Sequence, residues 1–179
     1  MRKTIKKLFW VWEFEKEEAW LNEMAARGLC LVSVGFCRYE FEDCTPGEYG
    51  IRMQLLEHHP NHPESVKYLE FLEETDVEPA GSWQKWVYLK KKTADGDFAL
   101  FSDNPSRIRH LTRVMNLLLA LGMMNLYIGA YNLFLVFSWQ NGVNILGAIN
   151  FILGILAMVG YAKLHKKRAR LKNEQQLFE

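Results

Sequence analysis

The spacing of apolar residues predicts two helices in the first hundred residues. Residues 16–27 place apolar side chains on one helical face and acidic side chains on the other, and Gly28 follows as a stop signal. Residues 64–75 repeat the apolar spacing and predict a second helix with its apolar side chains turned inward. Each predicted helix therefore has one face that other parts of the domain must cover.

Segments rich in aromatic and β-branched residues surround these helices and predict strands. The strands are expected over residues 8–14, 29–42 and 49–57, with a further strand or hairpin within 77–92. The sequence Thr45-Pro46-Gly47 has the residues of a three-residue hairpin loop. It predicts that the second and third strands form an antiparallel hairpin.

The predicted hairpin has a register that sets apolar residues opposite one another. Its pairs are Phe41 with Ile51, Tyr39 with Met53, Cys37 with Leu55 and Glu40 with Arg52. The apolar positions change phase near Gly35, which predicts a bulge. The resulting order, β-α-β-β-α-β, is typical of a ferredoxin-like α+β domain, which we place over residues 1–103. One face of its sheet would need a cover: a dimer mate, the 77–92 hairpin or a partner protein.

The second part of the chain contains a long run without charge. All 49 positions between Arg113 and Lys163 lack a charged side chain. Because a membrane-spanning helix needs roughly 20 apolar residues, the run predicts an all-α hairpin of two transmembrane helices, 114–137 and 143–162. The link Ser138–Gly142 is short and turn-forming, with Trp139 suited to the headgroup level.

Charged flanks predict the orientation of this hairpin. Residues 1–103 carry 13 basic and 19 acidic side chains, a net charge of −6, whereas residues 104–179 carry 9 and 2, a net charge of +7. Three arginines in the juxtamembrane helix start, 104–113, and six basic residues in the tail, 163–179, flank the apolar run. The positive-inside rule then predicts a multi-pass protein of the inner (cytoplasmic) membrane, in contact with the lipid bilayer and with both termini cytosolic. The acidic domain argues against direct nucleic-acid binding.

Small and amide residues recur along both predicted spans. The first stripe is Gly122, Asn125, Gly129 and Asn132, and the second is Gly147, Asn150, Gly154 and Ala157. Small residues let helices approach closely, and asparagines can hydrogen-bond across the contact. The stripes are expected either to pack against each other within one hairpin or to face another subunit, which leaves a homo-oligomer open.

Residues with reactive or metal-binding side chains are few. Three cysteines, an odd number in a cytosolic domain, predict reduced thiols. Cys30, His59 and His62 are weak candidates for a zinc site, although their spacing fits no zinc motif. The acidic set of residues 15–23 is expected to form the solvated face of the first helix. With no catalytic motif present, we predict neither an enzyme nor a bound cofactor.

Several sequence segments resemble an uncharacterised family of bacterial membrane proteins, a domain of unknown function designated 2812. The similar segments are FEKEEAWLNEMAARGL, GFCRYEFE with PGEY, YLEFLEET, KWVYLKKK and LFSDNPSRIRHLTRV. The resemblance implies a partnership with PadR-type transcriptional regulators, because members are commonly encoded beside them, and it implies no catalytic residues. This chain has Asp76 and Pro79 where the family pattern has Gly and an aromatic residue, so the resemblance leaves the turn and the pairing of the first half of 77–92 open.

These observations predict a membrane-anchored interaction or sensory module. It would bind a partner protein, such as a PadR-like regulator, through an aromatic surface, because buried aromatic residues dominate interface energetics. The residues expected there are Trp10, Trp12, Trp83, Trp86 and Tyr88. The alternative is a small-ligand or metal sensor domain tethered to the membrane.

Overall fold

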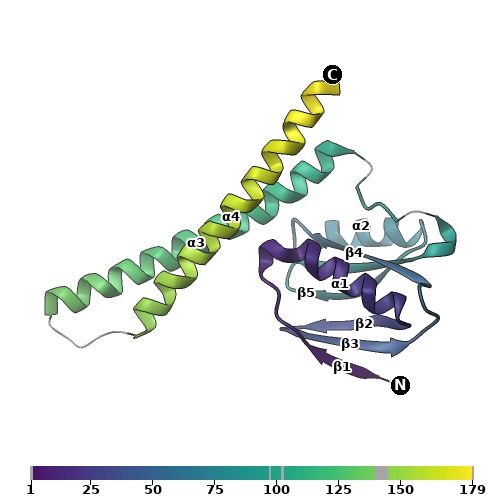
Figure 1. Ribbon diagram of the computed structural model, residues 1–179, viewed down its shortest axis with the longest axis horizontal. Helices are drawn as coiled ribbons and strands as arrows, with labels where there is room; N and C mark the ends of the chain where they lie inside the picture. The colour runs from purple at the N-terminus through teal and green to yellow at the C-terminus, as the bar shows by residue number, and fades with distance from the viewer. Residues whose placement is uncertain (1, 97, 102, 140–144, 179) are drawn as a thin grey trace. The chain divides into compact units, whose positions relative to one another are not determined.

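The computed structural model describes residues 2–96, 98–101, 103–139 and 145–178. The chain divides into two compact units, Met1–Ser102 and Asp103–Glu179, and each is described by itself. Unit 1, called the N-terminal domain below, holds all the strands and two α-helices (Figure 1). Unit 2 consists of two long helices.

The N-terminal domain contains two three-stranded antiparallel sheets. Its elements in chain order are β1 (Lys3–Lys6), η1 (Val11–Glu13), α1 (Phe14–Ala26), β2 (Leu29–Gly35), β3 (Arg38–Asp43), β4 (Tyr49–Leu55), α2 (Pro63–Glu73), β5 (Val77–Trp83), β6 (Trp86–Lys92) and η2 (Thr93–Asp95). The strand orders are β1-β3-β2 and β4-β6-β5. The α+β class is confirmed, but the ferredoxin-like arrangement is not.

Both predicted helices of the domain are present. Helix α1 ends where Gly28 adopts a φ of 81°, and a Cβ there would lie 2.9 Å from the Cys44 carbonyl oxygen. Helix α2 begins with Pro63 at its first position, after His62 as the N-cap. The segment 77–92 forms the hairpin β5–β6, with a register shift between Pro79 and Gly81. The pairing of this segment, left open by the sequence, is thus antiparallel with one irregularity.

The predicted strand 8–14 is wrong. The first strand lies earlier, at Lys3–Lys6, and the backbone turns into η1 and α1 from Val11 onward. The aromatic side chains of this segment pack against rings from other parts of the domain. The ring centroid of Phe9, for example, lies 5.6 Å from that of Trp20. Aromatic residues favour strands because they pack on half-buried surfaces, and here they find such packing without a strand ladder.

The predicted hairpin between 29–42 and 49–57 is also wrong. The chain reverses already at Phe36-Cys37, where Cys37 has a φ of 52°, so β2 pairs with β3. Strand β4 pairs instead with β6, which sets Ile51 opposite Lys90 and Met53 opposite Tyr88. The phase change near Gly35 marks this turn, and the bulge lies earlier, between Leu31 and Ser33.

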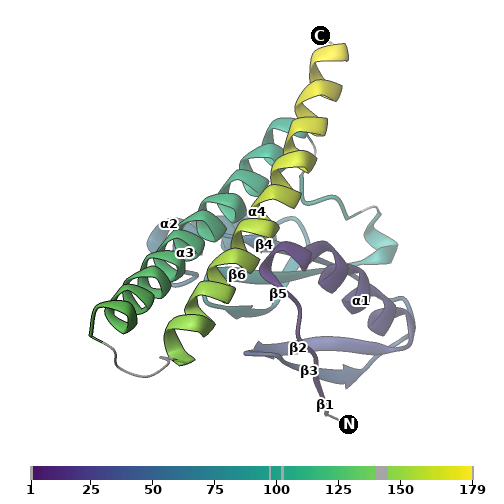
Figure 2. The same cartoon turned by 60° about the vertical axis from the view of Figure 1, so that its left-hand side comes forward.

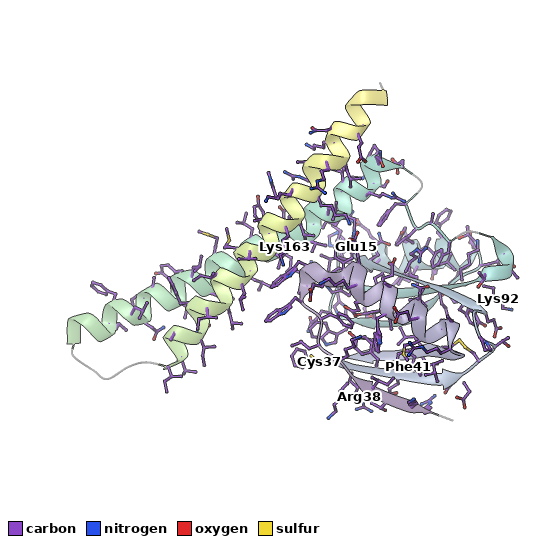
Figure 3. The ribbon with its side chains drawn as sticks, viewed as in Figure 1. Glu15, Cys37, Arg38, Phe41, Lys92 and Lys163 are labelled. Atoms are coloured by element: carbon purple, nitrogen blue, oxygen red, sulfur yellow. A yellow bond between two sulfur atoms is a disulfide. The ribbon has the colours of Figure 1, made fainter. Side chains whose placement is uncertain are left out.

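A disulfide corrects the prediction of reduced thiols. The hairpin places Cys30 opposite Glu42, and the Cys44 amide donates to the Gly28 carbonyl, which brings the Cα atoms of Cys30 and Cys44 to 5.8 Å. This separation suits a disulfide, and the two sulfurs are bonded (Figure 3). Cys37 is the one free cysteine.

Helix α1 is fixed to the free edge of β4 by polar side chains. The Asn22 amide accepts from the Ile51 nitrogen and donates to the Ile51 oxygen, both at 2.9 Å. The Glu18 carboxylate accepts from the Met53 nitrogen at 2.9 Å. Because these groups occupy backbone sites that an added strand would use, they cover the sheet edge and fix the position of α1.

The side chains of β6 alternate between two buried layers. Val87 and Leu89 pack with Leu56 and Val77 on the side of α2, where Tyr68, Leu69 and Leu72 are partly buried against them. Trp86 and Tyr88 point to the opposite side. They are also buried, and there they meet side chains from α1.

Unit 2 is a pair of antiparallel helices, α3 (Asn104–Trp139) and α4 (Ile145–Phe178), which lie side by side in Figures 1 and 2. The predicted juxtamembrane helix start at residue 104 is confirmed. Both helices are long and apolar enough to cross a membrane. Most of the predicted link Ser138–Gly142 lies outside the described residues. The basic tail continues α4, whose side chains beyond Lys163 appear in Figure 3.

Candidate aromatic pocket

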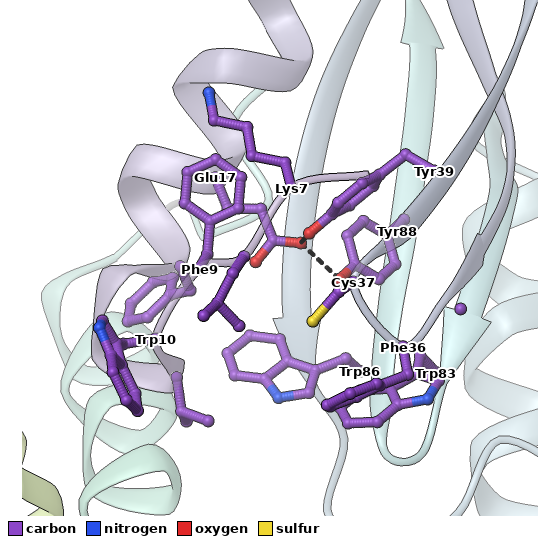
Figure 4. A pocket seen from close by; sticks show the side chains of 14 residues that line it. Lys7, Phe9, Trp10, Glu17, Phe36, Cys37, Tyr39, Trp83, Trp86 and Tyr88 are labelled. Atoms are coloured by element: carbon purple, nitrogen blue, oxygen red, sulfur yellow. Dashed lines mark hydrogen bonds between the residues drawn. The ribbon is translucent and has the colours of Figure 1, made fainter. Parts of the chain in front are cut away.

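A pocket of about 270 Å³ opens at one end of the N-terminal domain. Three segments meet there: residues 7–11 before α1, the β2–β3 turn and the β5–β6 turn, with the first turn of α1 beside them (Figure 4). Its walls are mainly aromatic: Phe9, Trp10, Phe14, Phe36, Trp83 and Trp86. We call this site the aromatic pocket.

The walls of the aromatic pocket are held by contacts between its segments. The Lys7 amide donates to the Cys37 carbonyl at 3.1 Å, which attaches residues 7–11 to the β2–β3 turn. The rings of Phe36 and Trp83 lie 5.7 Å apart and join the two strand turns, while Phe14 lies 5.7 Å from Trp86. Such ring pairs contribute about 1 kcal/mol each beyond the area they bury.

A carboxylate flanked by two tyrosines lies at the floor of the pocket. Glu17 comes from the first turn of α1 and is only 7% exposed. Its Oε1 accepts hydrogen bonds from the Tyr39 hydroxyl at 2.7 Å and from the Tyr88 hydroxyl at 2.6 Å. Figure 4 shows the second carboxylate oxygen turned toward the pocket interior.

Burial changes the acidity of all three groups. It raises the pKa of Glu17, because the two hydroxyl donors only partly offset the loss of water around the charge. Burial and the nearby Glu17 charge raise the pKa of Tyr39 and of Tyr88. Both hydroxyls therefore stay protonated and keep donating to the carboxylate.

The raised pKa of Glu17 predicts a stability that falls as the pH rises. Above the ordinary value of 4.5, the folded domain holds this proton more tightly than the unfolded chain. The Glu17 contribution is therefore fully present below pH 4.5 and is lost as the pH passes the folded-state pKa, with a slope of at most about 1.4 kcal/mol per pH unit. We expect E17Q to remove this slope.

The measurement is thermal unfolding of the detergent-solubilised chain from pH 5 to 8, followed by tryptophan fluorescence. Five of the six tryptophans lie in the N-terminal domain and report on it. E15Q is the matched control, because Glu15 is exposed on the same helical turn. An unchanged pH profile in E17Q would contradict the prediction.

Comparison with known proteins gives one match. A family model described as "Protein of unknown function (DUF2812)" matches residues 13–123, which is more than half of the chain. The chain belongs to the DUF2812 family. Comparisons with curated proteins and with solved structures find no match. The matched range includes Glu17, Tyr39, Trp86 and Tyr88 of the aromatic pocket, whereas the pocket residues 7–11 precede it.

The structure of this DUF2812 protein brings four of the five predicted partner-binding residues together. Trp10, Trp83, Trp86 and Tyr88 line the aromatic pocket. Trp12 lies outside the lining and stacks on Trp10, with ring centroids 5.1 Å apart. The aromatic residues thus enclose a concave site rather than a flat sheet face.

The prediction that the acidic set is solvated is wrong for Glu17. Its side chain is buried, and the carboxylate of Glu18 contacts β4, whereas Glu15 and Glu23 are exposed. The spacing held a signal that sequence analysis missed: Glu17 is three residues after Phe14 and four before Leu21, both buried on α1. Tyr39 and Cys37 were also missed as pocket residues because the strands were paired differently.

The weak metal candidates do not form a site in the DUF2812 structure. Cys30 is bonded to Cys44, and His59 Nδ1 accepts from the Asn61 amide at 3.4 Å. Among the described residues, the group with ligand atoms close enough to share an ion is His58, His62 and Glu64, all within 4.8 Å. It lies at the protein surface, where His58 Nε2 is 3.2 Å from the Glu64 carboxylate.

The two small-residue stripes face each other between α3 and α4. A Cβ on Gly122 would lie 3.2 Å from Ala157, and one on Gly147 would lie 2.6 Å from Asn132. The asparagine amides bond within their own helices: Nδ2 of Asn125, Asn132 and Asn150 each donates to the carbonyl four residues earlier. The glycines let the two helix backbones approach closely at this contact.

Proposed function

We propose that this DUF2812 protein is a membrane-tethered sensor whose N-terminal domain binds a small molecule in the aromatic pocket. The observation that carries the proposal is a concave apolar site with a few polar groups at its floor, all within one folded unit. Ligand sites in proteins have this composition: aromatic walls and a small number of placed polar groups.

We propose that the two helices of unit 2 tether this domain to a membrane. Two helices that can span a bilayer follow the sensor domain, and basic residues flank both of their outer ends. We place the domain and both termini in the cytosol, since positive flanks remain on that side. The tether would keep the pocket close to compounds that enter through or collect at the membrane.

A screen for ligands tests this function on the detergent-solubilised full chain. Compounds that raise the unfolding temperature are compared in the wild type, W83A and F71A. Trp83 is half-buried in the pocket wall, so its truncation is expected to weaken binding at least tenfold without unfolding the domain. Phe71 is 58% exposed on α2 and serves as the matched aromatic control. Ligands that bind W83A and the wild type equally would contradict a role for the pocket.

A second candidate function is binding of a protein partner. The rim of the aromatic pocket favours it, because Leu8, Trp10 and Phe36 are 62%, 39% and 75% exposed. The family resemblance implies a PadR-type transcriptional regulator as this partner. The two functions are compatible: a compound that fills the pocket would change the rim that the regulator contacts.

A further inference from the structure

The floor of the aromatic pocket holds a buried acidic side chain, Glu17. Among the described residues, no lysine, arginine or histidine is within ion-pair distance of Glu17. The tyrosine hydroxyls both donate to Oε1, so the second oxygen remains available to a group inside the pocket. A buried carboxylate is costly unless it is paired, and the residues that the structure describes give Glu17 two hydroxyl donors but no cation.

The one basic side chain in the pocket lining contacts aromatic rings. Lys7 lines the pocket, but its ammonium lies over the rings of Phe9 and Trp20, at 4.8 Å and 4.4 Å from their centroids. Figure 4 shows the side chain extending away from Glu17. The ammonium of Lys7 therefore contacts aromatic rings and forms no ion pair with Glu17.

The aromatic walls of the pocket, like Glu17, favour a positively charged ligand. The faces of aromatic rings carry partial negative charge and attract cations, most strongly when water is excluded. Phe9, Trp83 and Trp86 present such rings within the same pocket as the carboxylate. A carboxylate and several aromatic faces together disfavour an anion, and a volume of about 270 Å³ limits the ligand to a compact molecule.

We propose that the ligand of the aromatic pocket is a compact organic cation, an alkyl- or aryl-ammonium compound. Its charge pairs with the free oxygen of Glu17, and its apolar groups contact Trp83 and Trp86. This inference rests on the proposed small-molecule function and gives the chemical class of the ligand. A metal ion fits the pocket less well, because Glu17 is the only carboxylate in a lining that is otherwise mainly aromatic.

The test compares three probes of similar size on the detergent-solubilised full chain by calorimetry: phenyltrimethylammonium, its neutral isostere tert-butylbenzene, and benzoate. We expect the cation to bind at least tenfold more tightly than the isostere, and benzoate to bind weakest. E17Q should weaken cation binding at least tenfold and leave the isostere within threefold. E15Q is the matched control, expected to behave as the wild type.

A pH series in the wild type gives a second readout that does not depend on a variant folding. Cation binding should weaken as the pH falls and Glu17 takes up a proton, whereas binding of the isostere should not. Tyr39 from β3, Tyr88 from β6, Lys7 and Cys37 also face this end of the pocket. Comparison with E17Q, which keeps all four, separates their effect from that of Glu17.

The outcomes distinguish this inference from the function on which it rests. Equal binding of the cation and the isostere, unchanged in E17Q, would overturn the inference and leave an apolar ligand site intact. Occupation of the pocket can also be read from alkylation of the free thiol of Cys37, which lies in the pocket wall. If none of the three probes binds, and none slows this alkylation, the inference is overturned. The separate W83A screen would then decide whether the pocket binds any small molecule.

Discussion

Reducing the Cys30–Cys44 disulfide is expected to lower the free energy of unfolding of the N-terminal domain by about 3 kcal/mol. The bond joins residues separated by 14 positions and closes the β2–β3 hairpin. A closed loop of roughly 15 residues restricts the unfolded chain by about that amount in the chain-entropy model. The measurement is denaturant unfolding of the full chain, followed by tryptophan fluorescence with and without reductant.

Two variants separate the disulfide from the third cysteine. The double variant C30A/C44A should match the reduced wild type and show no further response to reductant. C37S is the control and should remain sensitive to reductant, since Cys37 is free. A reduced wild type as stable as the oxidised protein would contradict a stabilising role for the bond.

The disulfide also bears on the proposed orientation. Disulfides are rare in the cytosol, where we propose that the N-terminal domain lies. Alkylation in intact cells reads the state directly, because the bonded form offers only Cys37 and the reduced form offers all three cysteines. The number of alkylated cysteines shows whether the disulfide, and its stabilisation of about 3 kcal/mol, is present in the cell or forms only on later oxidation.

Helices were predictable from local signals, and strand partners were not. The apolar faces of helices α1 and α2 follow from the spacing of residues within each helix. Gly28, just after α1, and Pro63, at the start of α2, are local signals for where these helices end and begin. Strand pairing depends on distant segments, and more than one partner satisfies the apolar pattern. Phe41 matches Ile51 in the predicted register and Leu31 in the structure, and both choices pair apolar residues.

The pocket shows the same division. The aromatic residues were identified because their type and density are visible in the sequence. Their arrangement around Glu17 was not, since it requires the β2–β3 and β5–β6 turns to meet beside α1. Local spacing did place Glu17 on the buried face of α1, but a charge is usually assigned to the solvated face. A charged residue at a position where the helix spacing predicts an apolar one therefore indicates a candidate functional site.

Replacing Gly129 by valine is expected to separate α3 from α4. A Cβ at this position would lie 2.8 Å from the Phe151 nitrogen and 2.9 Å from its Cα, and backbone atoms cannot rotate away as a side chain can. Overpacking of this kind costs about 1–3 kcal/mol.

The matched control is A130V, because Ala130 is exposed on the next position of α3. Energy transfer between dyes at S106C and N173C, in a C37S background, measures the separation during an SDS titration. G129V should lose transfer at lower SDS than A130V, and coincident curves would show that the glycine contact does not hold the helix pair together.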